Sequence, residues 1–413
     1  MKPLHHALLI AASVFALNTS AADWAQYRGP NRDGKPAEFT APAAWPKQLV
    51  MKWSFRIGST DATPALVGDK LYVYAREGGE EVLTCLNTAD GKTIWQDKFP
   101  AGANAGGPAG GHPGPRACPA VSDGKVVTLG LGAILSCLDA ETGKVIWRKK
   151  PGQDFPAGYP NFMTASSPLL MDGLAIVQVG GGGRGGGTAA LVAFDLKTGE
   201  QKWKADTEGT GYASPALLTL DGAKQIVIQT GRSLAGISAA DGKPLWKIAT
   251  PPNGRAYNAP SPVVDGQVVY YTGGSTGVKA FKVEKTGDTY AAKELWTNDQ
   301  FGGNFSTPLV KDNQIYGLAE RGTLFCIDAK TGKTLWNKSG IANGGYGSVV
   351  DAGQVLIVLN SRSDMSIFKP SDKGYEEVAS LKVGDGQTYA LPIPAGNRVY
   401  VTEQGQVAAL AVE

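Results

Sequence analysis

Several residue types that support enzyme chemistry are scarce in this 413-residue sequence. It has three histidines, and two of them, His5 and His6, lie near the N-terminus. His112 is the single histidine of the remaining chain. That excludes a zinc site built from several histidines and leaves little basis for a Ser-His-Asp triad. We predict no catalytic residue and no metal site.

Charge of either sign is also scarce, at 19% of residues, and the two signs nearly balance. The formal net charge is +3, so no general electrostatic attraction toward nucleic acid is expected. The hydrophobic fraction of 42% can still fill a core, and the 55 glycines indicate many turns rather than disorder. We expect a globular monomer with no nucleic-acid partner.

The cysteines lack every pairing that indicates a redox or metal site. There is no CxxC, no CxxCH haem-attachment run and no adjacent pair. Three of the four cysteines, Cys85, Cys137 and Cys326, occupy the same position of the repeat described below, and the fourth is Cys118. We therefore expect buried structural thiols.

The first residues read as a secretory signal. Lys2 supplies a positive charge, residues 7–17 are apolar, and small residues follow with cleavage sites after Ala21 or Ala22. The alternative, a membrane anchor, is disfavoured because a spanning helix needs about 20 apolar residues. No cysteine for lipid attachment lies near the cleavage site. We expect residues 1–22 to be removed and the mature protein to be periplasmic or secreted, with no membrane span.

The rest of the chain is built from a repeated unit that ends in tryptophan. Residues 118–147, CPAVSDGKVVTLGLGAILSCLDAETGKVIW, match residues 307–336, TPLVKDNQIYGLAERGTLFCIDAKTGKTLW. The recurring tryptophans are Trp53, Trp95, Trp147, Trp203, Trp246, Trp296 and Trp336, at spacings of 40 to 56 residues. This period is typical of a β-propeller with four strands per blade.

Local composition supports an all-β fold with few helices. Runs such as 126–129 and 268–271 are β-branched or aromatic, and Asp-Gly pairs supply tight turns. Six units end between Trp95 and Trp336, a seventh without its tryptophan covers 348–380, and an eighth stops after three strands. The orphan strand at 50–55 can complete the eighth and remove the exposed edge. We predict an eight-bladed propeller over residues 45–413, preceded by an arm at 23–44; seven blades are the alternative.

These motifs resemble the pyrroloquinoline-quinone (PQQ)-repeat, or quinoprotein-type, propeller family. The resemblance rests on the D-A-x-T-G-K-x-x-W ending, seen from Asp139 to Trp147, and covers nearly all of residues 45–413. The segment from Trp24 to Gly34 is similar to the opening of exported bacterial members that are called BamB-like. The resemblance implies that the repeated tryptophans dock between blades, and a large flat side chain with one donor suits such a seam.

Strand alternation places the two hairpin turns of each blade on one face. The second–third loops and the interblade links lie on the other, which we call the loop face. Arginines recur there: Arg76, Arg116, Arg184, Arg232, Arg255, Arg321 and Arg362. An aromatic residue also recurs just before the inner strand: Phe162, Tyr212, Tyr257, Phe305, Tyr346 and Tyr389.

These arginines and aromatics allow two interpretations. They can bind a protein partner or an extended, anionic ligand through forked hydrogen bonds and stacking. Alternatively, the rings plug the channel mouth and the arginines tie loops to acidic neighbours such as Glu77, Glu320 and Glu403. Two glycine-rich loops, 101–116 and 180–187, also lie on this face, and we expect both to be exposed surface loops.

The family resemblance leaves two functional hypotheses. The first is a non-catalytic binding or scaffold protein in envelope protein assembly that uses the loop face and has no cofactor. The second is an alcohol or sugar dehydrogenase that depends on PQQ and calcium. Glu320, Glu403, Asp299 and Asn304 lie on the appropriate face for the second, but no recognisable ligand motif surrounds them. The sequence favours the first hypothesis.

Overall fold

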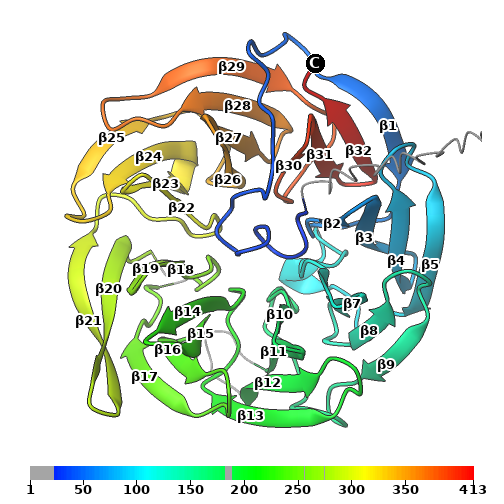
Figure 1. Cartoon of the computed structure of the whole chain (residues 1–413), viewed down its shortest axis with the longest axis vertical. Coiled ribbons are helices and arrows are strands. Elements are labelled where there is room, and N and C mark those ends of the chain that lie inside the picture. Colours follow the sequence, from blue (N-terminus) through cyan, green and yellow to red (C-terminus); the bar gives the residue numbers. More distant parts are fainter. Residues whose placement is uncertain (1–22, 182–187, 255, 274) are drawn as a thin grey trace, which may run out of the picture.

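The computed structural model describes residues 23–181, 188–254, 256–273 and 275–413. Eight four-stranded antiparallel sheets form a closed ring (Figure 1), which confirms the predicted eight-bladed propeller. The helices of the described residues are two three-residue 3-10 turns, η1 (Gly107–Ala109) and η2 (Glu320–Gly322), so the expected scarcity of helix is also confirmed. Neither is long enough to cross a membrane.

The first four blades follow one another along the chain. Blade 1 holds β2 (Ala65–Val67), β3 (Lys70–Glu77), β4 (Glu80–Asn87) and β5 (Thr93–Pro100). Blade 2 holds β6 (Ala120–Ser122), β7 (Lys125–Leu129), β8 (Leu135–Asp139) and β9 (Val145–Lys149). Blade 3 holds β10 (Leu169–Met171), β11 (Leu174–Gly180), β12 (Ala189–Asp195) and β13 (Gln201–Thr207). Blade 4 holds β14 (Ala216–Leu220), β15 (Ala223–Gln229), β16 (Ser233–Ser238) and β17 (Pro244–Ala249).

The remaining blades complete the ring. Blade 5 holds β18 (Val263–Asp265), β19 (Val268–Thr272), β20 (Val278–Thr286) and β21 (Thr289–Asn298). Blade 6 holds β22 (Leu309–Lys311), β23 (Gln314–Ala319), β24 (Thr323–Asp328) and β25 (Thr334–Lys338). Blade 7 holds β26 (Gly347–Ala352), β27 (Val355–Asn360), β28 (Asp364–Lys369) and β29 (Glu376–Lys382). Blade 8 holds β30 (Ile393–Ala395), β31 (Arg398–Glu403), β32 (Gln406–Ala411) and β1 (Val50–Arg56).

Blade 8 joins the two ends of the chain, as the orphan strand predicted. Strand β1 pairs antiparallel with β32 from Val50 opposite Ala411 to Arg56 opposite Gln406. The side chain of Trp53 is buried and contributes to a core that blade 8 shares with blades 1 and 7. The ring therefore closes through main-chain hydrogen bonds, which leaves β32 without a free edge.

A ring of hydroxyl groups links the innermost strands around the channel. The backbone N–H groups of Ser167, Ser214 and Ser261 donate to the hydroxyl of the next blade at 2.8–2.9 Å, as far as Thr307. At the closing seam, Leu391 N–H donates to Thr63 Oγ1 at 2.8 Å. Each hydroxyl precedes a proline in sequence. The hydroxyl oxygens thus accept hydrogen bonds from backbone N–H groups that would otherwise have no partner between the blades.

Most of the repeated tryptophans lie in the seams between blades. The indole N–H groups of six of them donate to a carbonyl in the next blade at 2.7–3.2 Å: Trp53, Trp95, Trp147, Trp203, Trp296 and Trp336. Trp246 differs, because its indole donates to Gln225 Oε1 in its own blade at 2.8 Å. The following hairpin, β20–β21, is longer than its counterparts and projects from the ring (Figure 1), so its turn lies away from this seam.

Glycine in the third–fourth turn lets the preceding tryptophan approach the backbone. At Gly143, with φ of +73°, an added Cβ would lie 2.5 Å from Trp95 Cε3. Gly124 has a similar φ of +68° in the first turn of the same blade, but nothing lies within 4 Å of its Cβ position. A comparison of substitutions at Gly143 and Gly124 therefore separates the steric conflict with Trp95 from the cost of a left-handed backbone.

We expect Gly143→Ala to destabilise the protein by about 1–3 kcal/mol more than Gly124→Ala. Both substitutions carry the cost of a left-handed backbone, roughly 1 kcal/mol, but only the first displaces Trp95. Urea denaturation of the two variants measures the difference. Equal losses would mean that the ring of Trp95 is free to shift.

The segment before β1 crosses the centre of the ring (Figure 1), a feature that the sequence does not reveal. Residues 23–44, the arm, contact blades 1, 2, 3, 5, 6, 7 and 8, at their inner strands, their first turns or the residues just before the inner strands. Trp24 pairs with Leu66 of β2, and Ala25 O accepts from Val121 N of β6. Near the other end, Thr40 N donates to Gly396 O at 2.8 Å. These backbone partners lie in the inner strands and first turns, so the two ends of the arm pair near the hairpin-turn end of the channel.

Two buried arginines fasten the arm to blades 3 and 6. Arg28 is 2% exposed and donates to the carbonyls of Thr307 and Pro308 at 3.1 and 2.8 Å. Arg32 is 6% exposed and donates to the equivalent carbonyl of blade 3, Pro168 O, at 2.8 Å. Desolvation lowers the pKa of both guanidinium groups. The arm is thus part of the packed interior.

Candidate functional site

The six aromatic residues predicted on the loop face gather into two groups. Phe162, Tyr212 and Tyr257 meet edge to face, with ring centroids 5.2–6.0 Å apart. In the second group, Phe305 stacks on Tyr346 at 4.7 Å, and Tyr346 meets Tyr389 edge-on at 5.8 Å. The separations and angles are those that aromatic pairs prefer.

The two groups differ in exposure. Phe305 is 48% and Tyr346 39% exposed, whereas Phe162, Tyr212, Tyr257 and Tyr389 are half-buried. A stacked pair of aromatic rings open to solvent is uncommon unless something packs on it. The second group is therefore the stronger candidate for a binding surface.

The predicted arginines have different surroundings. Arg76 is half-buried and donates to the carbonyls of Gly78 and Ala103 and to Asn104, so it secures the blade 1–2 link. Arg232, Arg321 and Arg362 are exposed. Arg184 and Arg255 lie outside the described residues.

The acidic residues suggested as partners of these arginines have other contacts. Glu77 pairs with Lys98 at 3.4 Å. Glu320 accepts hydrogen bonds from Asn304 and from Ser275. Glu403 is buried and accepts from Ser363 Oγ at 2.5 Å. In the described part of the chain, none of the three forms an ion pair with an arginine of the set.

The link 101–116 is less open than expected. Ala109 is buried against Leu131 and Met163, and Gly114 and Pro115 are buried as well. The expectation of an exposed loop holds for residues 102, 104, 106, 107, 110 and 111, whereas Ala109, Gly114 and Pro115 are buried because small residues pack against the neighbouring blade. Of the second loop, 180–187, residues 182–187 lie outside the described residues.

Packing of this link brings His112 against Asp61, a pairing that sequence reasoning missed. His112 Nδ1 lies 2.9 Å from Asp61 Oδ2, and Gln404 Nε2 donates to Asp61 Oδ1 at 2.6 Å. An ionised carboxylate only accepts, so the hydrogen of the pair belongs to Nδ1. The hydrogen bond with Asp61 raises the pKa of His112. The cluster spans blade 8, blade 1 and the blade 1–2 link, so it exists only in the closed ring.

Two further side chains complete this cluster. Arg116 Nη2 donates to His112 O at 2.8 Å, and its Nε lies 3.9 Å from Asp61 Oδ2. Tyr389 meets the His112 ring edge-on at 4.6 Å. Desolvation lowers the pKa of Arg116 and raises that of Tyr389. The second aromatic group thus continues, through Tyr389, into a cluster formed by His112, Arg116 and Asp61.

Comparison with known proteins places this architecture in a family. The family model described as outer membrane protein assembly factor BamB matches residues 79–338, which is more than half of the chain. The chain belongs to this family. A BamB protein from Xanthomonas campestris pv. campestris is 24% identical over 313 residues, covering 63% of this chain and 73% of the relative.

Similarity extends to a solved BamB and to quinoproteins. The crystal structure of BamB from Moraxella catarrhalis matches with a TM-score of 0.66 and 16% identity, over 88% of this chain and 97% of that one. At that identity the likeness shows the fold alone. Methanol dehydrogenase subunit 1 from Paracoccus denitrificans is 26% identical over 273 residues, which cover 62% of this chain and 40% of that protein.

The dehydrogenase relatives raise the question of a calcium-bound quinone. Calcium takes six to eight oxygen ligands. Over the described ranges, no three Asp, Glu, His or Cys side chains come close enough together to hold a metal ion. Asp299 is exposed, and Glu320 and Glu403 are engaged as described above. The residues present do not form a ligand set that fits calcium-bound PQQ. No PQQ or calcium chemistry is therefore assigned to this BamB-family chain.

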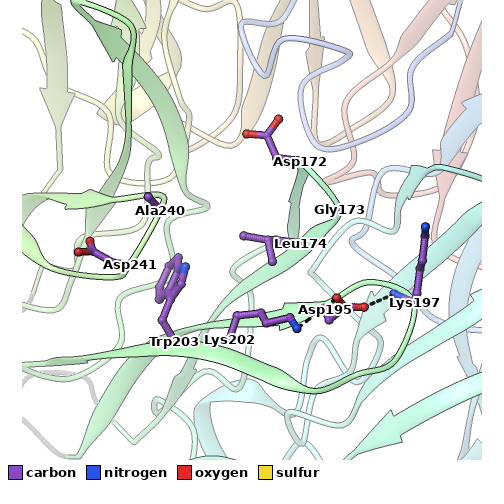
Figure 2. A pocket seen from close by; sticks show the side chains of 9 residues that line it. All are labelled: Asp172, Gly173, Leu174, Asp195, Lys197, Lys202, Trp203, Ala240 and Asp241. Carbon is purple, nitrogen blue, oxygen red and sulfur yellow. Dashed lines mark hydrogen bonds and ion pairs between the residues drawn. The ribbon is translucent and has the colours of Figure 1, made fainter.

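A pocket of about 630 Å³ lies on the opposite, hairpin-turn side, between blades 3 and 4 (Figure 2). Asp172, Asp195, Asp241 and Trp203 are among its lining residues. Asp195 accepts from the backbone of Lys197 and pairs with Lys202 at 3.5 Å, and Asp172 pairs with Lys224 at 2.7 Å. These carboxylates stabilise turns and surface pairs, so the pocket is a groove between repeated turns.

Proposed function

We propose that this protein is an exported, non-catalytic binding protein that takes part in envelope protein assembly. It acts in the periplasm or after secretion, and it works as a monomer. Its partner is a protein segment that docks on the loop face. Membership of the BamB family supports the assembly role, since relatives carry that description.

The observation that carries the proposal is the exposed Phe305–Tyr346 pair. Interface hot spots are enriched in aromatic residues at the centre of a contact. The two rings are presented by neighbouring blades and stacked at 4.7 Å, so little conformational entropy is lost on binding. The arm pairs through its backbone with inner strands and first turns, and it leaves the Phe305–Tyr346 pair uncovered.

The exposed arginines supply the electrostatic part of the proposal. Arg232, Arg321 and Arg362 come from blades 4, 6 and 7, and each carries a charge available for steering a partner. Arg184 and Arg255 are proposed to contribute in the same way. Attraction between exposed charges is screened at physiological salt, so binding through this face is expected to weaken as salt rises.

The proposal predicts loss of partner recovery when the aromatic pair is removed. With Phe305→Ala/Tyr346→Ala, cross-linking in envelope extracts followed by mass spectrometry should recover a specific partner at least about tenfold less well. The matched control is Ile146→Ala/Leu295→Ala, which removes side chains of 40% and 49% exposure from outer strands. Arg232→Ala/Arg321→Ala should flatten the salt dependence.

Two results would overturn this proposal. One is recovery of the same proteins, in the same amounts, with the aromatic variant and with wild type. The other is robust reduction of an artificial electron acceptor with alcohols or aldoses when PQQ and calcium are added. The second result would favour the dehydrogenase hypothesis. Sequence similarity to methanol dehydrogenase is the observation behind that hypothesis.

A further inference from the structure

The cluster of His112, Arg116 and Asp61 carries a net positive charge when the imidazole is protonated. Asp61 contributes one negative charge, whereas His112 and Arg116 contribute two positive ones. The His112 side chain is 35% exposed and its Nδ1 is occupied by Asp61, so Nε2 is the donor left for a ligand. Arg116 Nη1 is buried and has no hydrogen-bond partner in the described structure, so this group acts on a ligand through its charge and not by direct contact.

A series of aromatic ring contacts leads to this cluster. From Phe305 the contacts pass to Tyr346, then to Tyr389, and then to the His112 ring at 4.6 Å. Exposure is greatest at the Phe305–Tyr346 end and falls toward Tyr389. The ring contacts from Tyr346 to His112 measure 5.8 and 4.6 Å, a span that a few residues of extended chain cover at about 3.3 Å each.

We infer that this strip binds a peptide segment with a carboxylate within a few residues of an aromatic side chain. The carboxylate accepts a hydrogen bond from His112 Nε2, and the aromatic ring packs on Phe305 and Tyr346. Arg116 supplies the second positive charge behind the imidazole. The inference rests on the proposed binding function and specifies the chemistry of the partner segment.

The binding is expected to depend on pH through His112. The charged and titratable groups that face its ring are Asp61, Arg116 and Tyr389, and Asp61 has the largest effect, which raises the pKa of His112. A raised pKa keeps the imidazolium populated below the ordinary value of about 6.5 and somewhat above it. Affinity for a carboxylate is therefore greatest at mildly acidic pH and is lost as pH rises through the raised pKa.

Fluorescence anisotropy with labelled peptides tests the inference. The probes share a Gly-Ser spacer and end in a free-acid phenylalanine, an amidated phenylalanine, a free-acid alanine, or an amidated Asp-Phe pair. The peptide that ends in a free-acid phenylalanine should bind most tightly of the four at pH 5.5. Its affinity should be roughly tenfold lower at pH 8.5. Amidation or alanine should each reduce affinity by a similar factor. Recovery of affinity with the Asp-Phe probe would assign the carboxylate to a side chain instead of a chain end.

Substitutions separate a binding role from a structural one. His112→Gln should bind weakly at every pH and lose the pH dependence. Asp61→Asn should keep the dependence but move its midpoint to lower pH, an effect that a folding defect does not produce. Ile146→Ala/Leu295→Ala, with Phe305 and Tyr346 intact, should bind like wild type.

The inference fails if no probe binds at millimolar concentration or if the amidated phenylalanine peptide binds as well as the free acid. It also fails if His112→Gln retains the wild-type pH profile. Should the probes fail while cross-linking still depends on Phe305 and Tyr346, the proposed function stands and only this ligand chemistry is refuted.

Discussion

Replacing Arg28 with alanine is expected to lower the free energy of unfolding by about 3–4 kcal/mol. The guanidinium donates to three carbonyls, those of Thr307, Pro308 and Asp33, at 2.8–3.2 Å. All three would lose a charge-assisted donor in a site that water cannot readily enter, because Arg28 is only 2% exposed. The substitution also leaves a void where the side chain fills the channel.

Two variants sharpen this prediction. Arg28→Lys keeps the charge but lacks the planar fork that reaches two carbonyls at once, so it should recover only part of the loss. Arg56→Ala removes an exposed arginine at the end of β1 and should change stability by less than about 0.5 kcal/mol. Thermal and urea denaturation provide the measurement. If Arg28→Ala lowered the free energy of unfolding as little as Arg56→Ala, the contacts of Arg28 in the arm would contribute little to stability.

Removal of β1 is expected to have a still larger effect. A chain that begins at Ile57 lacks the strand that covers β32, whose sequence QVAALA carries no charge. An uncharged edge of this kind pairs readily with other chains. The truncated protein should form oligomers or aggregates in size-exclusion chromatography, and it should lose the seam packing of Trp53.

A matched truncation and a rescue experiment isolate the contribution of the closing strand. A chain that begins at Trp45 lacks the arm but keeps β1, so it should be destabilised yet remain monomeric. A synthetic peptide covering 47–57 should return the shorter chain to a monomer by pairing with β32 in the native register. If the chain that begins at Ile57 stays monomeric and has the same melting temperature as the chain that begins at Trp45, pairing of β1 with β32 is dispensable.

Much of the fold is accessible from sequence because its determinants are local. Most hairpin turns carry their own glycine, the third strands share an apolar pattern, and most units end in a tryptophan at a seam. The same logic of strand alternation predicts one face for the aromatic residues, and in the structure their rings gather into two groups. Trp246 is the exception, and its cause is equally local: the next hairpin is too long to bring its turn into the seam.

Only part of the candidate site could be predicted from local sequence patterns. Phe305, Tyr346 and Tyr389 recur at one position of the repeat and could be found by alignment of the units. Asp61, His112 and Gln404 do not recur, and Asp61 and Gln404 are 343 residues apart in sequence. Nothing in their surroundings links them, because they meet only when blade 8 closes against blade 1.

The sequence by itself determined the number of blades, the closing strand and the face on which function is proposed, because these follow from short periodic patterns. Only the tertiary structure decided that the arm crosses the centre of the ring and that His112 pairs with Asp61. The physical reason is that Arg28 and Arg32 bind backbone carbonyls, which every residue possesses and no sequence marks. Which carbonyls they reach depends on how the blades are arranged around the ring.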